Sequence, residues 1–208
     1  MLWAISGASA LLYWGFSLRE GTSWFRSSVK SLALVPLVVL ALVLSAPLVA
    51  AALALCSLGD VFLSRSGERF FLAGLISFAL GHLAWIAVFV LELGATPDQL
   101  NSVSMGLAVL AMSLHALFMI RVLLGRAGEL RLPVAIYIAI IMTMGVAALA
   151  TQSPMVIIGA VLFMASDTLL GLQTFILAKG GPFERAANIL IWPLYWVAVA
   201  ILASVSLA

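Results

Sequence analysis

Long apolar runs separated by short polar connections form the dominant pattern along the chain. A helix needs about 17–25 apolar residues to cross the hydrocarbon core of a bilayer. Runs close to this length cover residues 2–18, 30–45, 47–64, 70–91, 102–124, 132–150, 154–178 and 186–207. The connection between the second and third runs is so short that these two should form a close helical hairpin. We therefore predict an all-α, polytopic transmembrane helical bundle of eight spans that forms a single transmembrane domain over residues 1–208.

The basic residues fall only in or beside alternate connections of this pattern. They are Arg19, Arg26, Lys30, Arg65, Arg69, Arg121, Arg126, Arg131, Lys179 and Arg185. The only charged residues in the other connections are the acids Glu92 and Asp98. Lys and Arg mark cytoplasmic loops by the positive-inside rule, so both termini are expected outside (N-out/C-out).

Composition supports a membrane protein and excludes several other classes. Apolar residues make up 65% of the chain and charged residues 9%, too few charges to solubilise a globule of 208 residues. The net charge of +2 comes from basic residues spaced along the chain, so no nucleic-acid partner is predicted. Cys56 is the single cysteine, which excludes a disulfide framework and a cysteine-based zinc site.

The N-terminus has no signal-peptide pattern and is interpreted as a retained span. The short loops favour a bacterial inner membrane.

Two acids lie inside apolar segments, and we expect them to carry the function. Asp60 follows Gly59, and Asp167 follows Ser166. A charged group at bilayer depth costs about 2.5–3.5 kcal/mol on insertion scales, so intramembrane acids usually mark function. Each acid also follows a proline by the same interval, which hints at two parallel halves of four spans related about the membrane normal. At 1.5 Å per residue both carboxylates would lie ~20 Å from the outer ends of their helices.

The residues alone leave the role of each acid open. Asp60 could pair with Arg65, or it could be a catalytic acid or an ion site. Asp167 lies farther from its nearest basic residue, Lys179, so a simple surface pair is harder to form.

Other polar residues in the spans have both structural and functional interpretations. His82 lies on an aromatic helical face and is either a packed histidine or a proton carrier. His115 is interpreted as interfacial or structural, whereas Tyr137 and Tyr195 each need a hydrogen-bond partner. Lys30 would ordinarily extend to the headgroups. A further set of small residues predicts close helix packing. This set comprises Gly74, Ser77 and Gly81.

Several reaction classes lack their motifs. The sequence has no Gly-x-Ser-x-Gly nucleophile elbow, no His-Glu-x-x-His and no glycine-rich phosphate loop. A metal-independent acid–base enzyme without a cofactor remains, alongside a proton-coupled transporter or channel. A lipid-binding structural protein is the third alternative.

The chain resembles the YhhN-like integral membrane proteins, which include lysoplasmalogenases, from about Lys30 to Tyr195. The resemblance rests on Lys30 ahead of Pro36, Ser57-Leu58-Gly59-Asp60-Val61-Phe62-Leu63, Phe71-x-x-Gly74-x-x-x-Phe78-x-x-x-His82-x-x-Trp85, Tyr137, and Gly159-Ala160-x-x-Phe163-Met164-x-Ser166-Asp167-Thr168-Leu169-Leu170.

This resemblance implies hydrolysis of the vinyl ether bond of lysoplasmalogens, a step of ether lipid metabolism. The products would be a fatty aldehyde and a glycerophospho-headgroup. Asp60 and Asp167 would be catalytic, and a lysophospholipid would enter from the bilayer. The substrate-binding residues would be His82, Tyr137, Lys30, Tyr195 and Ser166.

Overall fold

The computed structural model describes residues 1–17 and 24–208, and these residues form helices joined by short connections, with no strand among them. Its long helices are α1 (Leu2–Ser17), α2 (Trp24–Leu32), α3 (Val35–Val43), α4 (Pro47–Leu63), α5 (Glu68–Ala87), α6 (Val103–Leu124), α7 (Arg131–Ala150), α8 (Pro154–Phe175) and α9 (Pro182–Ser206). A π-helical turn, η1 (Val88–Glu92), extends α5, and the 3₁₀ turns η2 (Pro97–Leu100) and η3 (Gly128–Leu130) precede α6 and α7. The predicted all-α class is confirmed.

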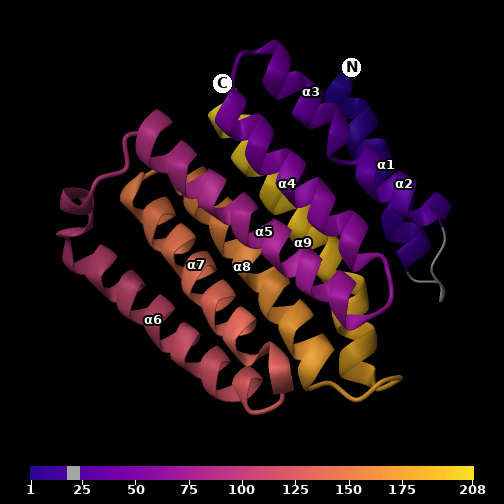
Figure 1. Cartoon of the computed structure of the whole chain (residues 1–208). Coiled ribbons are helices and arrows are strands. Elements are labelled where there is room, and N and C mark those ends of the chain that lie inside the picture. The colour runs from indigo at the N-terminus through magenta and orange to yellow at the C-terminus, as the bar shows by residue number, and fades with distance from the viewer. Residues whose placement is uncertain (18–23) are drawn as a thin grey trace.

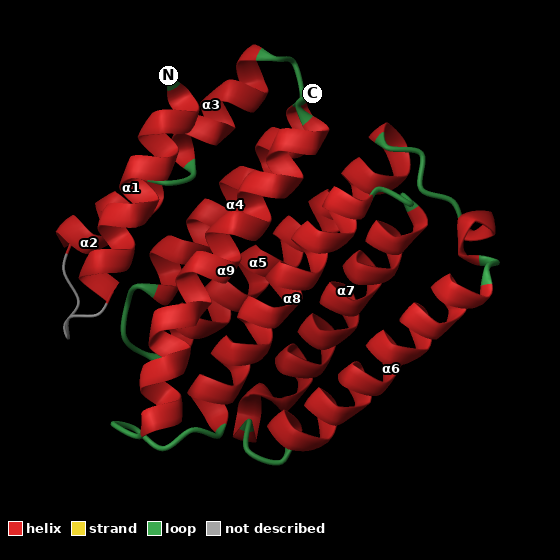
Figure 2. Cartoon of the chain, turned by 180° about the vertical axis from the view of Figure 1, so that it is seen from behind, coloured by secondary structure: helices red, strands yellow, loops and turns green. Residues whose placement is uncertain are grey.

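The helices lie side by side in one bundle, with α6 at one edge and α1–α3 at the opposite edge (Figures 1 and 2). Within the described residues, five helical segments are long and apolar enough to cross a membrane. They are Glu68–Glu92, Val103–Leu124, Gly128–Ala150, Pro154–Phe175 and Pro182–Ser206. Ser28–Val43 and Pro47–Leu63 are shorter apolar helical segments. The molecule is therefore a helical membrane protein, while the count of eight spans and the N-out/C-out topology stay predictions.

The predicted span at residues 30–45 is not one continuous helix, and this part of the sequence interpretation is corrected. The helix ends at Leu32 and restarts at Val35. Pro36 lies in the first turn of α3, where its missing N–H is tolerated but where it prevents the preceding helix from continuing. The Ser6 hydroxyl donates to the Ala33 carbonyl at 2.5 Å, which satisfies one backbone group at the break. The break leaves Lys30 in the last turn of α2, at a helix end inside the bundle.

Small residues allow α4 and α5 to pack closely, as predicted. A Cβ added at Gly74 would lie 2.7 Å from the Leu63 side chain, and one added at Gly81 would lie 3.0 Å from Cys56 Sγ. Ser77 donates its hydroxyl to the Leu55 carbonyl at 2.7 Å. These contacts fix the helix that carries Asp60 against the helix that carries His82.

Helix α9 packs along α8 and is also bonded to α1. The indole of Trp192 donates to the Ala10 carbonyl at 3.0 Å. Pro193 lies inside α9 and cannot donate to the carbonyl of Ile189, four residues earlier. The indole of Trp14 donates to that carbonyl instead, at 2.9 Å. Helix α1 therefore satisfies a backbone group that a proline within a span leaves unpaired.

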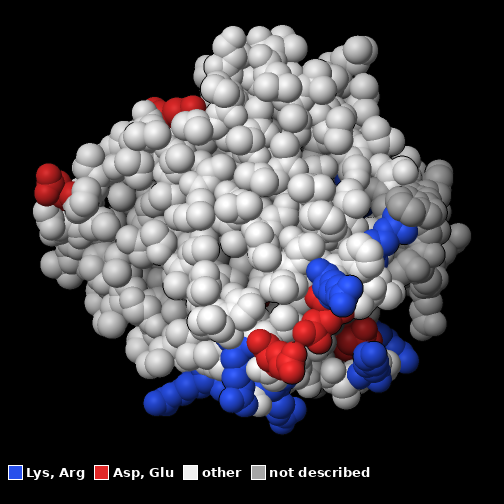
Figure 3. Space-filling view, viewed as in Figure 1, with Lys and Arg blue, Asp and Glu red and all other residues white. Residues whose placement is uncertain are grey.

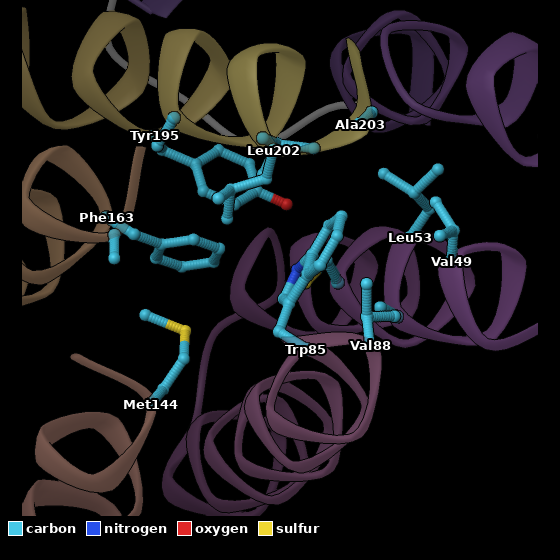
Figure 4. Packing of buried hydrophobic residues seen from close by; sticks show 14 of the residues in the cluster. Val49, Leu53, Trp85, Val88, Met144, Phe163, Tyr195, Leu202 and Ala203 are labelled. Carbon is cyan, nitrogen blue, oxygen red and sulfur yellow. The ribbon is translucent and has the colours of Figure 1, made fainter. Parts of the chain in front are cut away.

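Aromatic side chains from α5, α8 and α9 meet in the buried core, where Trp85, Phe163 and Tyr195 lie around a common centre (Figure 4). The rings of Phe163 and Tyr195 are edge to face with centroids 5.3 Å apart. His82 joins this cluster with its ring 4.6 Å from that of Phe163. The core thus places an ionisable ring among aromatic side chains at the middle of the bundle.

The charged side chains are distributed unevenly over the surface. In the view of Figure 3 the Lys and Arg side chains gather at the lower end of the molecule, and acidic groups without basic neighbours lie at the upper left. The connections between α4 and α5, α6 and α7, and α8 and α9 lie at this lower end (Figure 1). This arrangement agrees with the charge alternation along the sequence. We refer to this end as the basic end.

Candidate active site

The two intramembrane aspartates face one polar cavity. Asp60 lies in α4 and Asp167 in α8, and each helix begins at a proline thirteen residues earlier. The cavity has a volume of about 240 Å³ and extends from these carboxylates toward the basic end of the bundle. It is lined by Tyr13, Lys30, Asp60, Leu63, Phe78, Ser166, Asp167, Leu170, Gln173, Asn188, Ile191, Trp192 and Tyr195. Both acids therefore line the same cavity.

Asp60 forms an ion pair with Lys30. One carboxylate oxygen lies 2.8 Å from Lys30 Nζ, and the Asp60 side chain is only 2% exposed. The ammonium also lies 5.5 Å from the ring centre of Tyr13 and 5.3 Å from that of Trp192. Lys30 therefore points inward to Asp60 rather than out to the headgroups.

The other oxygen of Asp60 is available to the cavity. Asp60 Oδ2 and the Tyr195 hydroxyl are both buried, and neither has a hydrogen-bond partner among the described residues. Both residues line the polar cavity. Unpartnered buried polar atoms are rare in native proteins and call for an explanation such as a bound water or substrate. This oxygen could therefore accept a hydrogen bond from a molecule in the cavity.

Asp167 has a different environment, made of hydrogen-bond donors rather than a cation. Its Oδ2 accepts a hydrogen bond from the Tyr137 hydroxyl and lies 3.2 Å from His82 Nε2. The same imidazole nitrogen lies 3.0 Å from the Tyr137 oxygen. Helices α5, α7 and α8 each contribute one member of this triad. His82 is fully buried, while the Asp167 side chain is 11% exposed and reaches the cavity.

A second, apolar cavity begins on the other side of Asp167. It lies between α5, α6, α7 and α8 and has a volume of about 60 Å³. Its lining is Leu63, Phe71, Leu75, Phe78, His115, Met119, Leu123, Val134, Tyr137, Ile138, Ile141, Met142, Met164, Asp167, Thr168, Leu170, Gly171 and Phe175. The two cavities share Leu63, Phe78, Asp167 and Leu170 as walls. Asp167 is therefore the ionisable group where a polar and an apolar compartment meet.

The remaining candidate residues have the following positions. Ser166 is buried on the polar cavity wall and donates its hydroxyl to the Ile191 carbonyl at 2.9 Å, which ties α8 to α9. Tyr137 belongs to the apolar cavity and Tyr195 to the polar one. His115, interpreted from the sequence as interfacial or structural, lines the apolar cavity 3.0 Å from Thr168 Oγ1.

Sequence reasoning missed Gln173 and Asn188, whose amides line the basic end of the polar cavity. A signal for both was present. Gln173 lies seven residues after Ser166, and Asn188 lies four residues before Trp192, spacings that place side chains on one helix face.

Among the described residues, no group of three or more His, Cys, Asp or Glu side chains could hold a metal ion.

Together these features define a helical membrane protein with a buried acidic site between two compartments. The chain belongs to the YhhN family, whose model matches residues 24–205. Helix α1 precedes the matched region. Searches of curated proteins and of solved structures found no match to this chain.

Proposed function

We propose that this protein is a membrane hydrolase of the lysoplasmalogenase type, which cleaves the vinyl ether bond of 1-alkenyl lysophospholipids. The observation that carries the proposal is the position of Asp167 between a polar and an apolar cavity. A lysoplasmalogen has a polar headgroup on one side of its vinyl ether and a hydrocarbon chain on the other. The headgroup would occupy the polar cavity and the chain the apolar one, with the reacting bond beside Asp167.

The chemistry requires an acid and a carboxylate. Protonation of the vinyl β-carbon converts the vinyl ether into an oxocarbenium ion. Water then adds to the α-carbon and loses a proton, and the resulting hemiacetal collapses to the aldehyde as the glycerol oxygen takes up a proton. The net reaction consumes one water and needs no redox partner. General acid–base groups of this kind contribute typically ~10²–10⁴-fold to a rate.

The different environments of the two aspartates suggest separate roles. Asp60 is paired with a lysine, so it suits the role of the ionised carboxylate, which stabilises positive charge and accepts a proton from water. Asp167 reaches both compartments and would donate the proton to carbon. Tyr137 and His82 hold the Asp167 carboxyl group in place through its Oδ2 atom. Lys30 and Tyr195 would contact the substrate from the wall of the polar cavity.

The test is aldehyde release from a 1-alkenyl lysophospholipid by the purified protein. The matched control substrate is the 1-alkyl analogue, which has the same headgroup and chain length but no double bond. We expect aldehyde from the alkenyl lipid only. No aldehyde from either ethanolamine or choline lipids would contradict the proposal. Proton flux in liposomes would then test the alternative of a proton-coupled transporter or channel.

A further inference from the structure

The basic end of the polar cavity carries a hydrogen-bonded chain of side chains that the proposed chemistry does not use. Gln173 Nε2 donates to Asn188 Oδ1 at 2.5 Å, and Asn188 Nδ2 donates to Glu184 Oε1 at 2.8 Å. The other oxygen of Glu184 accepts from the Gly180 backbone N–H at 3.2 Å. We call Gln173, Asn188 and Glu184 the amide–carboxylate cluster. Gln173 and Asn188 line the cavity, and Glu184 is joined to it through its bond to Asn188.

This cluster offers acceptors to a molecule in the cavity. The amide oxygens of Gln173 and Asn188 each have two lone pairs, and the Glu184 carboxylate adds a negative charge next to them. A primary ammonium has three N–H donors, so it can form several hydrogen bonds with these acceptor oxygens. A trimethylammonium has no N–H and cannot donate to it. The cluster therefore suits a primary amine better than a quaternary one.

The cavity also contains aromatic rings that could hold a quaternary ammonium, but they already face a cation. The rings of Tyr13 and Trp192 lie 5.5 and 5.3 Å from Lys30 Nζ, within the range of a cation–π contact. The same ammonium is bound to Asp60 at 2.8 Å. A choline group would have to displace this lysine from the ring pair, which leaves the amide–carboxylate cluster as the cation site open to a ligand.

The distances along the bundle fit a lipid headgroup. Gln173 lies six residues beyond Asp167 in α8, which corresponds to ~9 Å along the helix axis toward the basic end. A headgroup whose glycerol oxygen lies beside Asp167 extends in this direction through its phosphate to its amine. Lys30 also lines this cavity, and its positive charge favours a phosphate there.

We propose that the polar cavity selects a phosphoethanolamine headgroup over a phosphocholine headgroup, with the amide–carboxylate cluster accepting hydrogen bonds from the primary ammonium. The inference rests on the proposed function, because it places the vinyl ether at Asp167. The ligand class is glycerophosphoethanolamine, either as part of the lysolipid or as the released product.

The first test compares kcat/KM for 1-alkenyl lysophospholipids that share one chain and differ only in the headgroup. Hydrogen bonds to a charged group are worth enough to give about tenfold discrimination, so we expect at least that preference for ethanolamine. Asn188→Leu and Gln173→Leu should reduce the preference to near unity by lowering kcat/KM for the ethanolamine lipid. Thr174→Val is the matched control, because this exposed hydroxyl is bonded within α8 to the Leu170 carbonyl. It should keep the preference.

A binding measurement separates this inference from the proposed function. Quenching of tryptophan fluorescence is measured in nanodiscs with 1-alkyl lysophospholipids, which are not cleaved, and with soluble glycerophosphoethanolamine and glycerophosphocholine. Tighter binding of both ethanolamine ligands, lost in Asn188→Leu, supports the headgroup site even if no aldehyde is formed. Preference for the lysolipid alone assigns the site to the substrate rather than to the free product. Equal or tighter binding of the choline ligands overturns the inference, whatever the protein hydrolyses.

Discussion

The two aspartates lie at equivalent places in similar helices, yet their surroundings differ in kind. Both lie thirteen residues after a proline that begins a helix, and both reach the same polar cavity. Asp60 is bound to a lysine at 2.8 Å and is almost fully buried. Asp167 is bound to a tyrosine and a histidine and also borders the apolar cavity. Similar helices thus carry a charge-paired acid in α4 and a hydrogen-bonded acid in α8.

The difference arises from the helices that pack against each acid. The partner of Asp60 comes from α2, which ends at a break inside the bundle and presents Lys30 there. The partners of Asp167 come from α5 and α7, which lie on the side of the apolar cavity. Two helices that each carry an aspartate thirteen residues after a proline therefore differ in the partners that their neighbouring helices provide.

Neutralising Asp167 should have the largest effect on activity. Asp167→Asn removes the acid where the compartments meet, and aldehyde release should fall by ~10²–10⁴-fold. A monodisperse elution profile in detergent checks that the variant is folded. Asp98→Asn, at an exposed position in the 3₁₀ turn before α6, is the matched control and should retain full activity. Near-normal activity of folded Asp167→Asn would remove this residue from the mechanism.

On the Asp60 side, the ion pair with Lys30 should have a large effect on the free energy of unfolding. Lys30→Met leaves a buried carboxylate without its cation, a change that costs about 3–5 kcal/mol for buried pairs. Adding Asp60→Asn in the same chain should restore most of this loss, because no unpaired charge then remains. The free energy of unfolding in mixed detergent micelles is the measurement. Equal stability of the single and double variants would show that the pair is not coupled.

Removing one donor to Asp167 should have an intermediate effect. Tyr137→Phe deletes the hydroxyl that donates to Asp167 and keeps the ring. Asp167 becomes a carboxylate as it gives up its proton, and a hydrogen bond to a charged group is worth about 1.5–3 kcal/mol, so we expect a fall in kcat of roughly 10- to 100-fold. Tyr195→Phe, which removes a hydroxyl without a hydrogen-bond partner, should lower kcat less. The reverse order would assign the proton transfer to the Asp60 side.

The apolar compartment can be shortened to test its role in chain binding. Gly171 lies on its wall, where an added Cβ would approach a Leu123 methyl group to 2.9 Å. Gly171→Leu should shift the preferred alkenyl chain to a shorter length and lower kcat/KM for long chains several-fold. Gly106→Leu is the control, because nothing lies within 4 Å of a Cβ at this position. An unchanged chain profile in Gly171→Leu would argue against a chain in this cavity.

The smallest expected effect is on stability, and it compares the packing of α4 against α5 with the packing of α8 against α9. A Cβ at Gly59 would lie 2.6 Å from the ring of Phe78, whereas one at Gly159 would lie 2.8 Å from the end of the Leu202 side chain. Overpacking costs about 1–3 kcal/mol, and a flexible leucine end can move more easily than a packed ring. Gly59→Ala should therefore destabilise more than Gly159→Ala in thermal unfolding. The opposite order would show that α4 and α5 adjust more easily than α8 and α9.

The sequence predicted those features that depend on short segments. The length of the apolar runs predicted the long helices, and the spacing of small residues predicted the close packing of α4 and α5. The isolated acids within apolar runs indicated Asp60 and Asp167. Each of these signals lies within one helix or one connection, so it can be read without knowing how the helices are arranged.

The features that sequence reasoning missed depend on contacts between distant helices. The partner of Asp60 is thirty residues away, across the break before Pro36, and nothing in the local pattern of either segment links them. His115 becomes part of a cavity wall only because α6 packs beside α8 and brings it to Thr168. The polar and apolar compartments likewise exist only in the assembled bundle, since four or more helices line each of them.

The measurement that tests the central claim most directly is the isotopic composition of the aldehyde formed in D₂O. A 1-alkenyl lysophospholipid is incubated with the purified protein, and the aldehyde is trapped at once by borohydride reduction before mass spectrometry. Acid-catalysed cleavage places one solvent proton on the β-carbon, so the account predicts one deuterium at carbon 2 and an intact glycerophospho-headgroup product. An aldehyde without deuterium at this carbon, or no aldehyde at all, would contradict it.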